Sequence, residues 1–140
     1  MLDLTPIIDE VSRWEAITAG PHRFGGVEFM LGAAEIGHIH QPSGLVDIPF
    51  TRRLREALVV EGEAGPHHLL AESGWISFYV RSEADIAQAI RLYRLSYVHK
   101  RARRDKAFAA TEQTELAALN LSERVRFALR GAGEDEVEGS

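Results

Sequence analysis

Cysteine is absent from this 140-residue sequence. Disulfides, thiolate nucleophiles and sulfur-dependent zinc sites are therefore excluded, which leaves His, Asp and Glu as candidate metal-ligating side chains. Long apolar runs are missing too, because ALVV (57–60) is far shorter than the roughly 20 residues of a membrane-spanning helix. The acidic N-terminus, MLDLTPIIDEV, lacks the basic region of a signal peptide. We therefore expect a cytoplasmic protein that does not span a membrane.

Charge of one sign does not dominate the chain. The formal net charge is −5, yet KRARRDK (100–106) is strongly basic and GEDEVEGS (133–140) is acidic. A basic run of this kind could follow a phosphate backbone. It contains no interleaved aromatic residue, so a solvated helix end is favoured over nucleic-acid binding.

Turn residues and apolar periodicity predict a single α+β domain, which a chain of this length can bury around one core. Helical spacing over 3–19 and from Ser82 onward predicts two helices, and a short helix follows Thr51. Glycine-separated segments predict the strands, at 23–31, 34–40, 44–50, 67–70 and 75–80. We expect an antiparallel sheet of about five strands. The first and the long helix should cover one face of this sheet and leave the other face for a site.

The predicted domain spans residues 1–105. Residues 106–130 are helix-prone and amphipathic only in pieces, so they are assigned to an extra C-terminal helical arm, and 131–140 to a disordered acidic tail. The apolar residues of the arm, such as Leu121 and Val125, need burial. Self-association of the arm would provide it, and a homodimer is therefore the expected assembly.

The stretch EIGHIHQPSGLVDIPF (35–50) contains the candidate site. In a strand, successive side chains point to opposite faces. Period-2 alternation therefore predicts that Ile36, His38 and His40 share one face and that Glu35 points to the other. The two histidines should point the same way, about 7 Å apart.

Two imidazoles on one strand face could bind a divalent metal ion. Zinc, iron, manganese or nickel would suit a set of histidines without thiolates. A third ligand could come from His22, His67 or His68. No helical HExxH or similar ligand motif accompanies the pair, so the metal site is one hypothesis among three.

The second hypothesis is acid/base chemistry, because an imidazole titrates near pH 6.5 and can take a proton from a phenol or an enol. Asp47 or Glu28 would orient the ring. The third is purely structural, with His38 and His40 bonded to neighbouring strands. The candidate catalytic residues are His38, His40, Asp47 and Glu35, and the candidate ligand-binding residues are His22, Arg23, His67, His68, Trp75 and Tyr79.

Three segments in order carry a family resemblance: PHRFGGVEFMLGAAEIGHIH (21–40), VDIPF (46–50) and HHLLAESGWISFYVRSEADIAQAIRLYRLSY (67–97). Together they resemble the bacterial luciferase-like domain family, which is also similar to part of the fungal luciferases. The order of elements is similar to the YjbR-like fold as well. Because fungal luciferases oxidise an enolic pyrone with oxygen, the resemblance implies a small phenolic or enolic ligand and His38 and His40 as bases. The alternative is a non-catalytic homo-oligomeric module.

Overall fold

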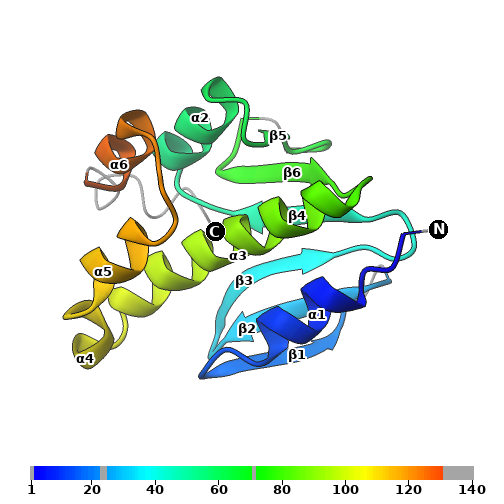
Figure 1. Cartoon of the computed structure of the whole chain (residues 1–140), viewed down its shortest axis with the longest axis horizontal. Helices are drawn as coiled ribbons and strands as arrows, with labels where there is room; N and C mark the ends of the chain where they lie inside the picture. Colours follow the sequence, from blue (N-terminus) through cyan, green and yellow to red (C-terminus); the bar gives the residue numbers. More distant parts are fainter. Residues whose placement is uncertain (1, 23–24, 71, 131–140) are drawn as a thin grey trace.

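The structure is a computed structural model that describes residues 2–22, 25–70 and 72–130. Its centre is a six-stranded antiparallel sheet with the strand order β1-β2-β3-β4-β6-β5 (Figure 1). The strands are β1 (Ile17–Pro21), β2 (Val27–Leu31), β3 (Ala34–Ile39), β4 (Leu45–Pro49), β5 (Gly65–Pro66) and β6 (Trp75–Tyr79). The predicted α+β class is confirmed, with one strand more than expected.

Six helices accompany the sheet in the described part of the chain. They are α1 (Thr5–Ser12), α2 (Arg52–Val60), α3 (Glu83–Ala102), α4 (Lys106–Ala109), α5 (Glu112–Ala117) and α6 (Glu123–Arg130). The first helix and the long α3 lie across the same face, as predicted (Figure 1). The apolar side chains between these layers are fully buried, among them Ile7, Val11, Phe29, Ile36, Ile39, Ile48, Ile76 and Leu92. The opposite face of the central strands is therefore the one available for polar side chains.

Side-chain caps fix where two of the helices begin. Thr51 Oγ1 accepts a hydrogen bond from Leu54 N at 3.2 Å and so starts α2. Ser82 Oγ accepts from Asp85 N at 3.4 Å at the start of α3. Both starts lie where the sequence predicts them.

Two predicted segments differ in the structure. The expected helix 3–19 ends at Ser12, and the chain enters β1 at Ile17. Between them Ala16 adopts a φ of 72°, which no helix accommodates, so the helix could not have continued to residue 19. Ile17 continues the helical spacing of Ile7, Val11 and Trp14 in the sequence, but it is the first residue of β1. The expected strand 67–70 is a loop, and the edge strand that pairs with β6 is instead the two-residue β5.

A β-bulge interrupts β3 and corrects the predicted alternation. Phe29 pairs with Gly37 and Met30 with Glu35, so Ile36 is an extra residue on β3. Ile36 lies in the core at 0% exposure and does not share the face of His38. The extra residue returns Glu35 to the face on which His38 lies, which the simple alternation excluded.

The C-terminal segment 106–130 consists of three short helices instead of one. They pack on α2 and α3 of the same chain, and this packing buries Leu116, Leu121 and Val125. The apolar residues of the expected arm are thus covered within the chain, and a homodimer stays a prediction. The expected acidic tail, 131–140, lies outside the described residues. Among the described helices, none combines the length and the apolar composition needed to cross a membrane.

The basic segment 100–106 makes contacts within the fold. Lys100 Nζ donates to the carbonyl of Pro49 at 2.5 Å and to Ser96 Oγ at 2.9 Å. Arg101 donates to Tyr97 Oη at 2.7 Å and lies 3.1 Å from a carboxylate oxygen of Glu15. Part of the positive charge therefore ties the end of α3 to its surroundings.

Candidate histidine–carboxylate site

A row of polar residues crosses the sheet on the face away from α3. Glu28 pairs with His38, His38 with Asp47, and Asp47 with Ser77, so that β2, β3, β4 and β6 each contribute one residue. A Cβ built on Gly37 would lie 2.8 Å from Cε1 of Tyr93 on α3, which shows that this neighbour faces the helix layer. His38, next along the strand, therefore points to the opposite side.

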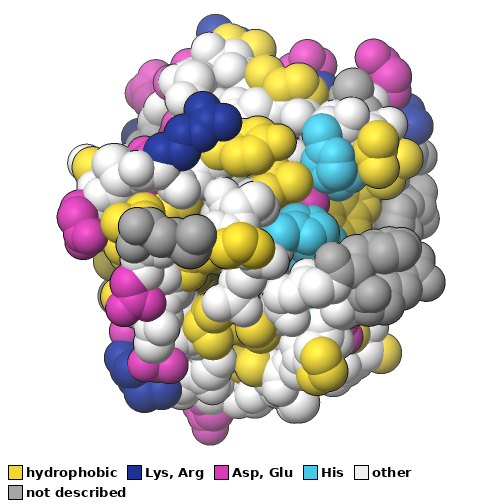
Figure 2. Space-filling view, turned by 90° about the vertical axis from the view of Figure 1, so that its right-hand side faces the viewer, with side chains coloured by type: hydrophobic (Ala, Val, Ile, Leu, Met, Phe, Trp, Pro, Cys, Tyr) yellow, Lys and Arg dark blue, Asp and Glu magenta, His cyan; other side chains and the backbone are white. Residues whose placement is uncertain are grey.

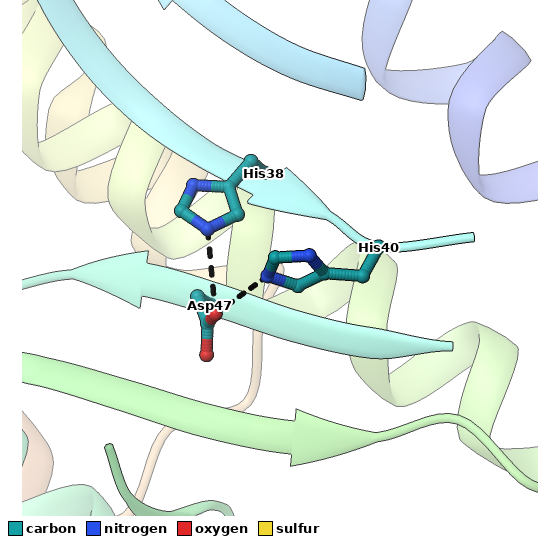
Figure 3. A group of neighbouring side chains, drawn as sticks. All are labelled: His38, His40 and Asp47. Carbon is teal, nitrogen blue, oxygen red and sulfur yellow. Dashed lines mark hydrogen bonds and ion pairs between the residues drawn. The ribbon is translucent and has the colours of Figure 1, made fainter. Parts of the chain in front are cut away.

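Asp47 is the centre of the site and is only 1% exposed. His40 Nε2 lies 3.1 Å and His38 Nε2 3.3 Å from Asp47 Oδ2 (Figure 3). His68 Nε2 approaches the same oxygen at 3.4 Å, while Ser77 Oγ donates to Oδ1 at 2.7 Å. Burial by itself would raise the pKa of Asp47, but the hydrogen bonds from His38 and Ser77 hold this pKa well below its usual range. The carboxylate is therefore ionised in the folded chain.

His38 is held by two carboxylates. Its Nδ1 lies 2.6 Å from Glu35 Oε2, and its Nε2 faces Asp47. Burial opposes ionisation of this ring, but the hydrogen bonds to Asp47 and Glu35 outweigh it and raise the pKa of His38 to about 9. The His22 ring stacks on that of His38 with centroids 3.9 Å apart, and burial followed by the charge of His38 lowers the pKa of His22.

His67 has a defined tautomer. Its Nδ1 accepts hydrogen bonds from the backbone N–H groups of Leu69 and Leu70, both at 3.0 Å. A neutral imidazole carries one proton, so that proton sits on Nε2, which lies 3.6 Å from Asp47 Oδ1. Burial is the main cause that lowers the pKa of His67, in keeping with a neutral ring.

His40 and His68 each have one ring nitrogen directed away from Asp47. Within the described residues, neither Nδ1 atom has a hydrogen-bond partner. The His68 side chain is 37% exposed and that of His40 is 21% exposed. Figure 2 shows histidine side chains in two neighbouring groups at the surface, with the tip of an acidic side chain between them and apolar atoms around them. These two imidazoles are therefore accessible to a ligand.

The His/Asp cluster could hold a metal ion. Two sets of three residues bring one ligand atom each to within 4.8 Å of one another, namely His38, His40 and Asp47, and Asp47, His67 and His68. Both sets share Asp47, so they are alternatives for a single ion at that carboxylate.

The structure brings most of the predicted site residues together. Those in mutual contact are His22, Glu35, His38, His40, Asp47, His67, His68 and Trp75, the last with its ring 5.5 Å from that of His38 and 5.8 Å from that of His67. Arg23 lies outside the described residues. Tyr79 is 43% exposed, pairs with Leu45 and lies under the Arg81 guanidinium at 4.6 Å, so its described contacts are not with the cluster.

Ser77 was missed as a candidate from the sequence. It donates the shortest hydrogen bond to Asp47. The sequence does place Ser77 on the same strand face as Trp75 and Tyr79. Its contact with Asp47 could be predicted only if the pairing of β4 with β6 were known.

Comparison with protein-family models gives a match. The family model described as the Luciferase domain matches residues 33–96, which confirms the resemblance seen in the sequence. The matched segment includes β3, β4 and β6 and therefore the central carboxylate with four of the histidines around it. No curated protein and no solved structure matches the chain.

Proposed function

We propose that the luciferase-like segment 33–96 uses this site to bind a small phenolic or enolic molecule and to remove its hydroxyl proton. The observation that carries the proposal is the arrangement of His40 and His68: their Nε2 atoms face the buried carboxylate of Asp47, and their Nδ1 atoms have no hydrogen-bond partner among the described residues. An imidazole oriented by a buried carboxylate is a general base, because the carboxylate fixes the tautomer and stabilises the imidazolium that forms.

The proposed step is a proton transfer. The O–H bond of the ligand breaks, the proton moves to Nδ1 of His40 or His68, and the electron pair remains on the ligand oxygen. The positive charge on His38 lies beside these rings and favours the resulting anion. The enolate or phenolate is the electron-rich form, which is oxidised by molecular oxygen more readily than the neutral ligand, and the family match supports oxygen as the oxidant.

Apolar surface beside the histidines suits an aromatic or conjugated ring. The indole of Trp75 is partly exposed and contacts the rings of His38 and His67. Leu69 and Leu70, which follow the two loop histidines, are 79% and 51% exposed. Burial of exposed apolar surface of this kind by a planar ligand is favourable.

Binding of two simple probes tests this proposal, namely 4-hydroxy-6-methyl-2-pyrone as an enol and 4-nitrophenol as a phenol whose absorption changes on deprotonation. We expect saturable binding by calorimetry and a deprotonated 4-nitrophenol spectrum in the complex. The double variant His40→Ala/His68→Ala should lose the spectral change because both proposed bases are removed.

A matched pair on one strand provides the control. Trp75→Leu should weaken binding of both probes, and Tyr79→Leu should leave it unchanged, since Tyr79 lies on the same strand face but contacts Arg81. Failure of both probes to bind the folded wild-type chain would refute the proposal and favour the non-catalytic homo-oligomeric module.

A further inference from the structure

We propose that His38, His40 and Asp47 form a binding site for one divalent transition-metal ion, with further coordination positions open to the ligand and to oxygen. This inference deepens the proposed function and rests on it for the role of the ion, but not for the ion's binding. Two histidines and one carboxylate that leave positions open are the ligand set of non-haem iron oxygenases.

The distances at the site fit coordination to one ion. With metal–ligand bonds of about 2.1 Å, two ligands at octahedral or tetrahedral angles lie about 3.0–3.4 Å apart. Asp47 Oδ2 lies 3.1 Å from His40 Nε2 and 3.3 Å from His38 Nε2, and Figure 3 shows both nitrogens directed at this carboxylate. An ion between the three atoms would take the place of the proton that His38 Nε2 shares with Asp47.

Hydrogen bonds around the site prepare these atoms for coordination. Glu35 faces His38 Nδ1 at 2.6 Å, and a proton held there leaves the Nε2 lone pair for a metal. A carboxylate behind a metal-ligating histidine is a common arrangement, which orients the ring and increases its basicity. Ser77 occupies Asp47 Oδ1, so that Oδ2 is the oxygen presented to the ion.

The competing set, Asp47 with His67 and His68, is disfavoured by the tautomer of His67. Its Nδ1 accepts two backbone N–H groups, so the Nε2 atom that faces Asp47 carries the proton and has no lone pair to donate. Coordination through Nε2 would require both of these loop hydrogen bonds to break. The ion therefore belongs to the set on β3 and β4, and His68 remains available as the base for the ligand.

The choice between the two sets yields a decisive experiment. Untagged protein, stripped with a chelator and dialysed, is titrated with Co²⁺ while heat and visible absorption are recorded. We expect one Co²⁺ per chain. His40→Ala should weaken binding at least tenfold, whereas His68→Ala should change it less than threefold.

Glu35→Gln adds a readout for the hydrogen bond behind His38. Loss of such a carboxylate typically weakens metal binding about 10–100-fold. We expect this weakening together with an altered Co²⁺ spectrum and an unchanged circular dichroism spectrum. His40→Ala should likewise retain its circular dichroism spectrum, because its side chain is partly exposed.

Three outcomes would overturn the inference: absence of Co²⁺ binding at micromolar concentration, a larger loss in His68→Ala than in His40→Ala, or equal small losses in both, as expected for adventitious surface histidines. The two proposals fail separately. Binding of 4-nitrophenol to the stripped protein without a Co²⁺ site would remove the metal site alone. A Co²⁺ site without probe binding would remove the ligand proposal alone.

Discussion

His99, on α3, should make the fold sensitive to acid. The side chain is 7% exposed, and burial, followed by the charges of Lys100, Arg103 and Arg104, lowers its pKa from 6.5 to about 3. The folded chain therefore holds His99 neutral at pH values where the unfolded chain protonates it. Between about pH 6.5 and 3 the unfolded state binds more protons at this residue, so stability falls as the pH falls.

The expected size of this effect is large for a domain of this length. Each pH unit below about 6.5 costs about 1.4 kcal/mol in the free energy of unfolding, or about 3 kcal/mol by about pH 4.5. Small domains are typically stable by about 5–15 kcal/mol, so one histidine would remove a substantial part of the total. Above about pH 6.5 its contribution is constant, because it is neutral in both states.

Guanidinium denaturation of the wild type and of His99→Leu, at intervals from pH 8 to pH 4.5, measures this contribution. Other groups titrate in both proteins, so the difference between the two curves isolates His99. We expect a constant difference above pH 7 and a relative stabilisation of His99→Leu that grows to about 3 kcal/mol at about pH 4.5. A difference that stays constant over the whole range would refute the reasoning, because His99 would then be as accessible to protons in the fold as in the unfolded chain.

Three further substitutions test the packing that holds the site. Gly37→Ala should cost about 1–3 kcal/mol in denaturation, because its Cβ would lie 2.8 Å from Tyr93 Cε1 at a φ of 155°; Gly20→Ala, with nothing within 4 Å, is the control and should cost less. Tyr93→Phe removes the donor to the His38 carbonyl, and we expect a loss of about 1–3 kcal/mol; unchanged stability would contradict that bond. Ser77→Ala should weaken Co²⁺ binding about tenfold in calorimetry, since Asp47 loses its orienting donor; equal affinity would show that Ser77 is dispensable.

The strands and helices that frame the site follow from local sequence patterns. Ser82 and Thr51 cap the first turns of α3 and α2 through side-chain hydrogen bonds to backbone N–H groups three residues later. Contacts over so few residues can be predicted from the sequence. Asp47 could also be identified as a candidate from the sequence, because it interrupts an apolar strand and a buried charge requires partners. The partners of Asp47 could not be predicted from the sequence. They depend on the pairing of β4 with β6, which joins Asp47 to Ser77 across 30 residues.

The bulge at Ile36 explains the main error about the site. Alternation of side chains assumes one residue per pleat, and an extra residue shifts every assignment on one side of it. Gly37 permits the required backbone, but a lone glycine in a strand does not say whether it marks a bulge or a close contact. Here it marks both, since it lies against Tyr93. The error placed Glu35 on the wrong face, whereas in the structure its carboxylate contacts His38.

The same bulge links the imidazoles to a layer that no ligand reaches. Tyr93 Oη donates to the carbonyl of His38 at 2.8 Å, and Ser96 Oγ donates to the carbonyl of Ile36 at 2.9 Å. These two hydrogen bonds from α3 hold the backbone of β3 on both sides of Gly37, at the bulge. The position of His38 relative to Asp47 therefore depends on side chains of α3, on the face of the sheet opposite the site. Substitutions at these two helix positions would shift the backbone that carries His38 without replacing any side chain of the site itself.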